Sequence, residues 1–469
     1  MDLKKSKRLL IVLAVIFWVF AIGIYAIGFE QFRASTVSED VAKPQYVIGE
    51  IVDGMELEQT FTVPVDSLHN VSIMMATYNR TNTGFLTLTL SSEGGILWRQ
   101  ITDISTIADN QYLSISLPEP VSVKPGGMLR LQLSTQGCST GNAVTVYAGS
   151  SDSAYMLNGL SGEGGLTVHI NGEKARSFYI YYWLIVSGMF LLALCYVLIC
   201  WKAAKRGKTN GLVSLCTVYS RYSFLIKQLV SRDFKTKYKR SALGMAWSFV
   251  NPLLTMSVQY VVFSTLFRTD IPNYPVYLLT GIVFFTFFNE ATTMGMTAIT
   301  GNAALIKKVY MPKYIYPVSR IISSLVNFAF ALMPLFLVML LTGTPFRWSM
   351  LLLLFDILCL LAFVTGMTLL LTTAMTFFQD TQFLWSVVGM MWQYLTPIFY
   401  PESIIPASIL PIYRLNPLYQ FITFARTCIT GGVSPAPEAY AACMVSGGLV
   451  LLLGMLVFKK HQNKFVLYV

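Results

Sequence analysis

Charged residues are scarce in this chain. Asp, Glu, Lys and Arg make up only 12% of its 469 residues, whereas hydrophobic residues make up 54%. The mean hydropathy is +0.58. Because a soluble globular chain carries about 25% charged residues, the composition excludes an ordinary soluble enzyme. It predicts a mainly α-helical polytopic membrane protein.

Histidine and cysteine are also scarce, and they are scattered. His69, His169 and His461 lie far apart in the sequence and form no metal-ligand motif. Only Cys138 of the seven cysteines falls in the long hydrophilic stretch, so that stretch has no internal disulfide. The sequence has no GxxxxGK[ST] phosphate loop and no GxSxG elbow. We therefore expect no metal, no cofactor and no catalytic residue in this chain.

The positive charge is unevenly distributed. The net charge is +11, yet the stretch 29–176 contains 8 basic and 15 acidic residues. The excess of Lys and Arg therefore accompanies the apolar runs and their short loops. This distribution favours contact with anionic lipid headgroups over contact with nucleic acid.

Eight apolar stretches are candidates for membrane spans. A basic segment with Lys4, Lys5, Lys7 and Arg8 precedes the first, which predicts an uncleaved anchor with a cytoplasmic N-terminus. The basic loops also predict a cytoplasmic C-terminus. We expect the protein to reside in the cytoplasmic (inner or plasma) membrane. The predicted spans are 9–28, 178–201, 245–267, 276–300, 315–342, 349–377, 383–399 and 439–458.

Between the first two spans, apolar and polar residues alternate. The alternation is clearest at 58–63, 85–90, 113–117, 129–133, 143–147 and 166–170, with Gly, Asn and Asp turn signals between them. This pattern predicts an extracellular all-β sandwich over residues 30–176. Tyr78, Trp98 and Tyr112 either fill the sandwich or stack on sugar rings.

The stretch 222–240 has helical periodicity with a basic side. An apolar stripe runs through Tyr222, Leu225, Ile226, Leu229, Val230, Phe234 and Tyr238. The other side carries Lys227, Arg232, Lys235, Lys239 and Arg240, and Asp233 interrupts it at the edge of the stripe. We expect an amphipathic helix in the membrane interface that leads through 241–244 into the next span. The plainer interpretation is a basic anchor beside the membrane.

Two other regions do not fit simple spans. Pro397 and Pro401 each remove a helix donor and should break the seventh span near its outer end. The region 401–437 contains two apolar pieces, 404–410 and 418–429, that are too short to cross a bilayer. It is expected to form a re-entrant helical pair.

Four motifs in this order carry a family resemblance. They are RDFKTKYKRSALG at 232–244 with Trp247 and Pro252, NAALIKKVYMP at 302–312 with Pro317, TPIFYP at 396–401, and NP at 416–417. Together they resemble the permease subunit of ABC-2 type polysaccharide exporters, the group that moves O-antigen, teichoic acid and similar glycans. The resemblance covers a little over half of the chain.

The resemblance implies a six-span permease core that forms a homodimer and works with two separate ATPase subunits, which bind ATP and Mg. It assigns the loop 302–312 to ATPase coupling, through Asn302, Leu305, Ile306, Lys307, Lys308, Val309 and Tyr310. It identifies the amphipathic helix as a gate helix that touches the diphosphate headgroup of a lipid-linked glycan, with candidates Arg232, Asp233, Lys235, Lys237, Tyr238, Lys239 and Arg240. Lys and Arg suit that headgroup chemically.

A glycan channel needs apolar and aromatic walls along which sugar rings can slide. The candidates are Phe284, Phe285, Phe288, Trp385, Trp392 and Tyr394. An outer gate is expected at Thr396, Pro397, Phe399, Tyr400 and Pro401.

These features predict the transmembrane subunit of an ABC exporter for lipid-linked polysaccharide, which is not itself an enzyme. The alternatives are a membrane-bound enzyme that transfers or modifies cell-surface glycans and a permease for drugs or lipids. The β domain either binds the emerging glycan or is a docking platform for cell-wall partners. The expected organisation is a first transmembrane anchor at 1–29, a β sandwich at 30–176, a second transmembrane helix at 177–201, a cytoplasmic linker with the interfacial helix at 202–241, and the permease core at 242–469.

Overall fold

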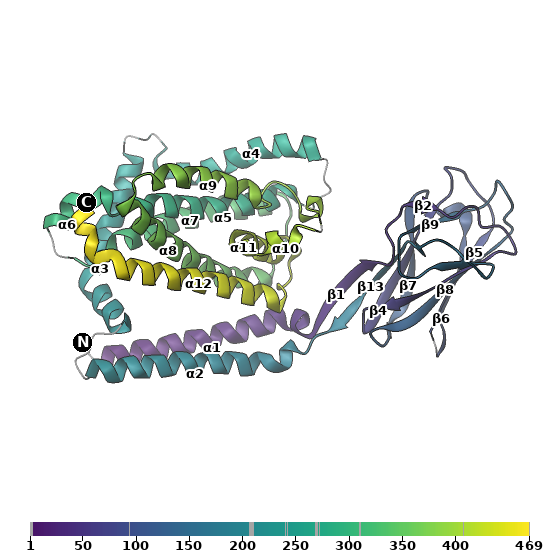
Figure 1. The fold of residues 1–469 in the computed structure, drawn as a ribbon, viewed down its shortest axis with the longest axis horizontal. Coiled ribbons are helices and arrows are strands. Elements are labelled where there is room, and N and C mark those ends of the chain that lie inside the picture. Colours follow the sequence, from purple (N-terminus) through teal and green to yellow (C-terminus); the bar gives the residue numbers. More distant parts are fainter. Residues whose placement is uncertain are drawn as a thin grey trace. The chain divides into compact units, whose positions relative to one another are not determined.

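The computed structural model describes residues 3–92, 94–205, 211–239, 241, 243–267, 271, 273–308, 311–406 and 408–468. The chain divides into two compact units (Figure 1). Residues Phe32–Ile180 form one unit, called the β-unit below. Residues Met1–Gln31 and Tyr181–Val469 form the other, called the helical unit.

The β-unit consists of two antiparallel sheets. One has the strand order β1-β13-β4-β9-β12, with β2 paired to β9 and β7 paired to β4, and the other has the order β11-β10-β3-β8-β5-β6. The strands are β1 Ala34–Asp40, β2 Tyr46–Val47, β3 Glu56–Val63, β4 Ser67–Ala76, β5 Phe85–Ser92, β6 Gly95–Asp103, β7 Gln111–Ser122, β8 Gly127–Gln136, β9 Thr145–Gly149, β10 Tyr155–Leu157, β11 Leu160–Ser161, β12 Gly165–Leu166 and β13 Val168–Ala175. The 3₁₀ turn η1, Ile104–Thr106, joins β6 and β7.

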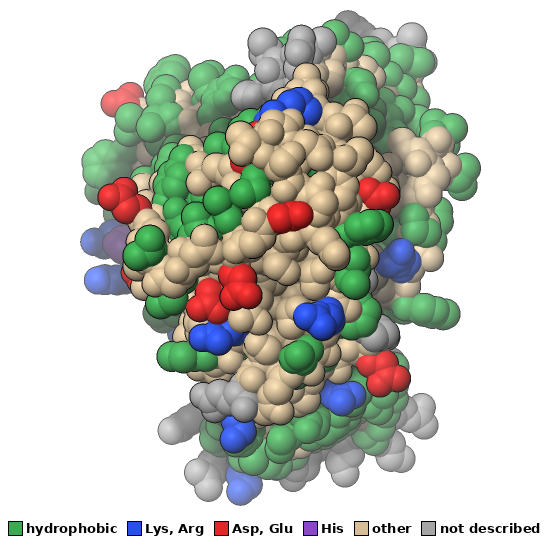
Figure 2. All heavy atoms as spheres, turned by 90° about the vertical axis from the view of Figure 1, so that its right-hand side faces the viewer, with side chains coloured by type: hydrophobic (Ala, Val, Ile, Leu, Met, Phe, Trp, Pro, Cys, Tyr) green, Lys and Arg blue, Asp and Glu red, His purple; other side chains and the backbone are tan. Residues whose placement is uncertain are grey.

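Inward-facing residues of both sheets make one core. Leu57 and Phe61 of β3 and Val71 and Ile73 of β4 are almost fully buried in it. Successive side chains of a strand point to opposite faces, so the period-two pattern produces this core. The β-sheet region predicted from the alternation is confirmed. On the face turned toward the viewer in Figure 2, acidic and basic side chains are scattered singly or in small groups among hydrophobic and other side chains.

The helical unit contains long apolar helices joined by short turns. The helices are α1 Leu3–Arg33, α2 Phe178–Lys205, α3 Gly211–Tyr238, α4 Trp247–Phe267, α5 Tyr274–Met296, α6 Ala303–Lys308, α7 Ile315–Leu341, α8 Leu353–Phe377, α9 Thr381–Leu395, α10 Leu410–Arg414, α11 Pro417–Arg426, α12 Pro437–His461 and α13 Phe465–Tyr468. Shorter turns are η2 Gly244–Ala246, η3 Thr300–Asn302, η4 Trp348–Leu352, η5 Glu402–Ile404, the π-helical turn η6 Thr427–Gly431, and η7 Gln462–Lys464.

Six helical segments of the described residues are long and apolar enough to cross a membrane, judged by length and composition. They are Ile11–Arg33, Phe178–Cys200, Tyr274–Met296, Ile315–Leu341, Trp348–Phe377 and Pro437–Tyr468. The multi-pass prediction is therefore confirmed, and the spans expected at 245–267 and 383–399 stay predictions. Helix α9 has 15 residues, about 22 Å at 1.5 Å per residue, which is shorter than a bilayer core of about 30 Å.

Glycines allow α12 to pack closely along α8 (Figure 1). A Cβ atom added to Gly454 would lie 2.3 Å from the backbone oxygen of Gly366, and one added to Gly447 would lie 2.6 Å from that of Cys359. Small residues at helix contacts are how membrane helices approach each other. Elsewhere in the unit, α1 and α2 lie side by side, with the Tyr25 ring against Tyr182 and Trp183.

Candidate functional site: the junction of α3 with the loop before α7

Helix α3 ends close to the boundary that the sequence predicted. Tyr238 is its last helical residue, and Gly244 has a φ of +52°, in the left-handed region that favours glycine. The short turn η2 then leads into α4. The amphipathic helix and the apolar helix expected after it are thus two helices separated by a sharp turn.

The apolar side of α3 packs on protein. Leu229 is buried in a cluster with Ile306 of α6, Tyr316 of α7 and Phe465 of α13. Tyr222, Leu225 and Ile226 pack against the same cluster. The stripe that predicted an interfacial helix therefore fixes α3 to the elements around the loop 300–314, while Lys227, Lys235 and Lys239 on its other side are exposed.

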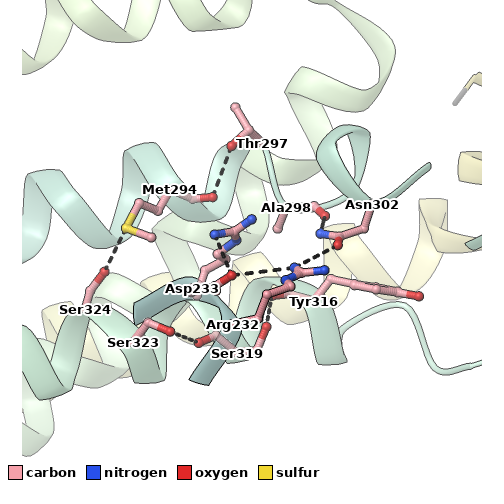
Figure 3. Close-up of polar contacts among 11 residues, drawn as sticks. Arg232, Asp233, Met294, Thr297, Ala298, Asn302, Tyr316, Ser319, Ser323 and Ser324 are labelled. Carbon is pink, nitrogen blue, oxygen red and sulfur yellow. Dashed lines mark hydrogen bonds and ion pairs between the residues drawn. The ribbon is translucent and has the colours of Figure 1, made fainter. Parts of the chain in front are cut away.

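A buried carboxylate fastens α3 to α7 and to the loop (Figure 3). The Asp233 side chain is only 4% exposed, and its Oδ1 lies 3.0 Å from Arg320 Nη1 and 3.5 Å from Arg232 Nη2. Arg232 Nη2 also donates to Asn302 Oδ1 at 3.0 Å. Asp233 is thus the centre of a charged link between three elements, which the sequence showed only as a break in a basic pattern.

A second polar link lies one helical turn further along α3. Lys237 Nζ lies 2.8 Å from Glu290 Oε1 on α5. The Tyr238 hydroxyl donates to Asn327 Oδ1 on α7 at 3.2 Å and also contacts Ser248. The end of α3 is therefore fixed to α4, α5 and α7 by side-chain hydrogen bonds.

The predicted coupling loop folds as η3 and α6. Asn302 and Ile306 are buried, Leu305 is partly buried, and Lys307 and Lys308 are exposed. The apolar side of this predicted coupling loop thus packs inside the helical unit, in the cluster around Leu229. Two other predicted coupling residues, Val309 and Tyr310, lie outside the described residues.

Lys313 secures the far end of this loop. Its Nζ donates to the backbone oxygen of Gln462 at 2.8 Å, and burial lowers its pKa. The loop is therefore attached to α3 through Asn302 and to the C-terminal segment through Lys313.

A hollow of about 590 Å³, called the basic hollow below, lies on the exposed side of α3. Arg232, Lys235 and Lys239 contribute positive charge to it, and Tyr238 also lines it. Lys and Arg at such a surface suit an anionic group. Lys237 faces Glu290, and the predicted Arg240 lies outside the described residues.

The predicted outer gate forms an irregular loop over residues 396–401, called the outer-gate loop below. Helix α9 ends at Leu395, and Thr396 is already extended. Thr396, Pro397 and Phe399 are buried, and Tyr400 and Pro401 are partly buried.

Hydrogen bonds from neighbouring elements hold this loop. The hydroxyls of Tyr274 and Tyr277 donate to the backbone oxygens of Phe399 and Tyr400 at 2.7 and 2.9 Å. Asn416 caps α11 by accepting from the Leu418 N–H, while its Nδ2 donates to Thr396 Oγ1 at 2.9 Å. The NP motif thus both starts α11 and fixes the loop.

Arg426 of α11 is a site residue that the sequence reasoning missed. It is 7% exposed and donates to the backbone oxygens of Pro397 at 2.6 Å and Ile398 at 2.9 Å. Its guanidinium carbon lies 3.4 Å from the centre of the Tyr277 ring. A single arginine within an otherwise apolar stretch is itself a functional signal in a membrane protein, and the sequence contained it.

The aromatic candidates for a channel divide into two groups. Phe284, Phe285, Phe288 and Trp385 are buried inside the helical unit. Trp392 is partly buried and its ring contacts Phe288, whereas Tyr394 is 61% exposed. In a single chain, Tyr394 is therefore the most exposed of the six.

The three aromatic candidates of the β-unit come from different elements. Trp98 on β6 packs partly against the core, whereas Tyr78 and Tyr112 are 39% and 41% exposed. Arg80 lies over the Tyr78 ring at 4.8 Å. Trp98 and Tyr112 belong to different sheets, so the three do not form one platform on a single sheet.

Residues 224–429 match the family described as ABC-2 type transporter. This part of the chain is therefore an ABC-2 type transporter domain, and it contains the site residues from Leu225 of α3 to Arg426 of α11. The resemblance predicted from the four motifs is confirmed for this part.

The similar curated proteins are polysaccharide export permeases by name. The chain is 29% identical over 248 residues to "O-antigen export system permease protein RfbA" of Myxococcus xanthus, an alignment that covers 52% of this chain and 95% of the relative. It is 27% identical over 247 residues to the protein of the same name in Klebsiella pneumoniae, covering 51% and 93%. It is 22% identical over 255 residues to "Polysialic acid transport protein KpsM" of Escherichia coli, also covering 51% and 93%.

Proposed function

We propose that this protein is the transmembrane subunit of an ABC exporter that moves a lipid-linked polysaccharide across the cytoplasmic membrane. A separate ATPase subunit hydrolyses the ATP, and two copies of the chain form the transport path. In this arrangement eight spans place both termini in the cytoplasm and the β-unit outside. The similar permeases support the transport class.

The observation that carries the proposal is the charged link at Asp233. A push on the loop 300–308 by an ATPase reaches α3 through Asn302 and Arg232, and it reaches α7 through Asp233 and Arg320. Because these contacts and the cluster around Leu229 are packed together, the elements move as a group. The exposed Lys307 and Lys308 are the groups offered to an ATPase surface.

The basic hollow supports an anionic headgroup as the cytoplasmic recognition element. A diphosphate has several acceptor oxygens, and Arg232, Lys235 and Lys239 present donors to the same hollow. Movement of α3 then changes the surroundings of the headgroup. At the other end of the path, the outer-gate loop is a short irregular segment whose displacement would open an exit.

A hollow in the β-unit supports glycan binding there. It has a volume of about 890 Å³, and acidic and hydroxyl side chains line much of it: Glu39, Asp40, Asp152, Thr60, Thr62, Ser150, Ser151 and Ser153. Such groups pair with sugar hydroxyls. We expect glycan arrays probed with the protein to show binding that the change Asp152→Ala weakens, whereas an array without any signal would favour a protein-docking role.

The test of the transport proposal uses the source strain. Removal of the protein should leave lipid-linked glycan inside the cell while surface glycan is lost, and the wild-type chain should restore export. The variant Asp233→Asn should restore it poorly, whereas Lys43→Gln in the β-unit should restore it fully. Normal surface glycan in the absence of the protein would contradict the proposal.

A second candidate function has one observation in its favour. Ser38 Oγ lies 2.9 Å from His169 Nε2, and His169 Nδ1 lies 2.7 Å from Asp40 Oδ1. This order of groups suits ester hydrolysis: Ser38 attacks the carbonyl as its proton passes to His169 and on to the leaving alcohol, and water then releases the acid from Ser38. The regular pairing of β1 with β13 places Asp40 opposite His169 and so accounts for that contact without catalysis.

A serine-reactive fluorophosphonate separates the two functions. Labelling of the full-length protein that disappears in Ser38→Ala would favour the enzyme. No labelling is expected if the chain is a permease only.

A further inference from the structure

A smaller hollow shares Tyr238 with the basic hollow. Its volume is about 280 Å³, and α3, α4, α5 and α7 all contribute to its lining. Sites for small molecules commonly measure about 300 to 1,000 Å³, so this hollow suits a ligand of about one ring. It is called the Glu290 hollow below.

Glu290 offers one unused acceptor in this hollow. Lys237 Nζ and Asn327 Nδ2 both donate to its Oε1, at 2.8 and 2.5 Å. Among the described residues, Oε2 has no hydrogen-bond partner. The side chain is 21% exposed, so a ligand hydroxyl can reach a carboxyl group that is held in a fixed position.

The other walls of the hollow are aromatic. Phe287 and Phe328 are buried, while Trp247, which also lines the hollow, is 44% exposed. The buried Asn327 adds an amide to the lining. Aromatic faces beside a carboxylate and an amide suit a molecule that has an apolar ring face and hydroxyl groups at its edge.

The same chemistry disfavours other ligands. An acyl chain in the hollow would cover Glu290 Oε2 without pairing it, which is costly for a buried polar atom. The Glu290 carboxylate would disfavour a phosphate in this hollow, whereas the Arg and Lys side chains of the basic hollow favour one. The arrangement therefore separates an anionic part of a ligand from a neutral polyol part, with Tyr238 between them.

We infer that the Glu290 hollow binds one sugar residue, the one attached directly to the diphosphate of a lipid-linked glycan. The inference rests on the proposed function and goes beyond it by assigning a recognition site for a single sugar on the cytoplasmic side. The exporter then selects its cargo by the linking sugar, independently of the length of the polymer that follows.

The test measures equilibrium binding of two radiolabelled lipids to the full-length protein with its ATPase. Detergent-free nanodiscs are needed, because glycoside detergents carry sugars of their own. One lipid is a polyprenyl diphosphate, and the other is a small panel of the same lipid with a single hexose or N-acetylhexosamine. We expect at least one sugar-bearing lipid to bind about tenfold more tightly than the bare lipid, the size expected for a hydrogen bond to a charged group.

Two variants locate that preference. Glu290→Gln and Trp247→Leu should each bring the affinity for the sugar-bearing lipid close to that for the bare lipid, whose own affinity stays unchanged. Trp348→Leu, which removes a 78% exposed tryptophan of η4, is the matched control and should keep the preference. If Trp247→Leu unfolds, Trp247→Phe takes its place. It retains an aromatic ring and should keep part of the preference for the sugar-bearing lipid.

Two outcomes would overturn the inference: equal binding of the bare lipid and the whole panel by the wild type, or a preference that survives both variants. In either case the bare lipid still binds, and the proposed function stands. The proposed function itself would fail on two different results together. The wild-type protein would bind no polyprenyl diphosphate, and the source strain would keep normal surface glycan without the protein.

Discussion

The exchange of Asp233 for Asn removes the charge that faces Arg320. The two side chains are 4% and 22% exposed, and their closest atoms are 3.0 Å apart. At that distance and an effective dielectric constant of about 20, the attraction is about 5 kcal/mol before desolvation is counted. Removal of one partner of a buried pair costs about 3 to 5 kcal/mol, because the other charge stays buried without compensation.

A double-mutant cycle isolates the pair. Asp233→Asn and Arg320→Gln should each destabilise the protein, and the double variant should be more stable than the sum of the two effects implies, by about 1 to 3 kcal/mol. The matched control pair is Arg414 and Glu402, 3.2 Å apart but 64% and 40% exposed. Its coupling should stay below about 1 kcal/mol, since water screens an exposed ion pair.

The assay is equilibrium unfolding in mixed micelles with SDS as denaturant, combined with ATPase activity of the assembled exporter. The Asp233 and Arg320 variants should lose stability and should also lose the coupling of ATPase activity to glycan transport. A coupling energy no larger than that of the control pair would refute the view that the buried charge joins α3 to α7.

Three further predictions concern other parts of the chain. Gly454→Ala should cost about 1 to 3 kcal/mol by overpacking α12 against α8, whereas Gly448→Ala, whose Cβ meets nothing within 4 Å, should not destabilise the same SDS unfolding; equal effects would contradict the packing. Arg426→Met should cost about 1 to 3 kcal/mol in that assay, by analogy with hydrogen bonds in other membrane proteins, and should increase protease access to the outer-gate loop; unchanged access would exclude its anchoring role. The Gly141 N–H and the Arg80 guanidinium lower the pKa of Glu50 below its ordinary value near 4.5, so this carboxylate stabilises the β-unit above that pH and less as the pH falls further. Amide exchange of β9, corrected for intrinsic rates, should therefore increase below about pH 4.5 in the wild type and depend less on pH in Glu50→Gln; an identical pH dependence would show that Glu50 contributes nothing.

Local patterns predicted the elements but not the contacts between distant parts of the chain. Four of the six alternating stretches fall within a single strand, and the other two, 143–147 and 166–170, overlap β9, β12 and β13, because period two reports a half-buried strand directly. Strand β4 was missed: its run from Val71 to Ala76 is mostly apolar and is buried on both faces, so it has no clear alternation.

The amphipathic helix shows the same limit at the site. Its stripe was visible in the sequence, but a stripe does not say whether lipid or protein covers it, and here the cluster around Leu229 does. Asp233 pairs with Arg320, and Arg426 donates to the backbone oxygen of Pro397. The two members of each pair are well separated in the sequence, so only the folded structure could show these contacts. The resemblance assigned Ile306 to ATPase coupling, and in the folded chain this apolar side chain is buried in the cluster around Leu229.

The most direct test of the exporter account is a pull-down of the tagged protein in mild detergent. We expect an ATPase with Walker motifs at about one copy per permease chain. The charge reversal Lys307→Glu with Lys308→Glu should release it, and the same reversal at the exposed Lys43 and Lys124 of the β-unit should not. If no ATPase accompanies the wild-type protein under any condition, the account is wrong and the membrane-enzyme alternative takes precedence.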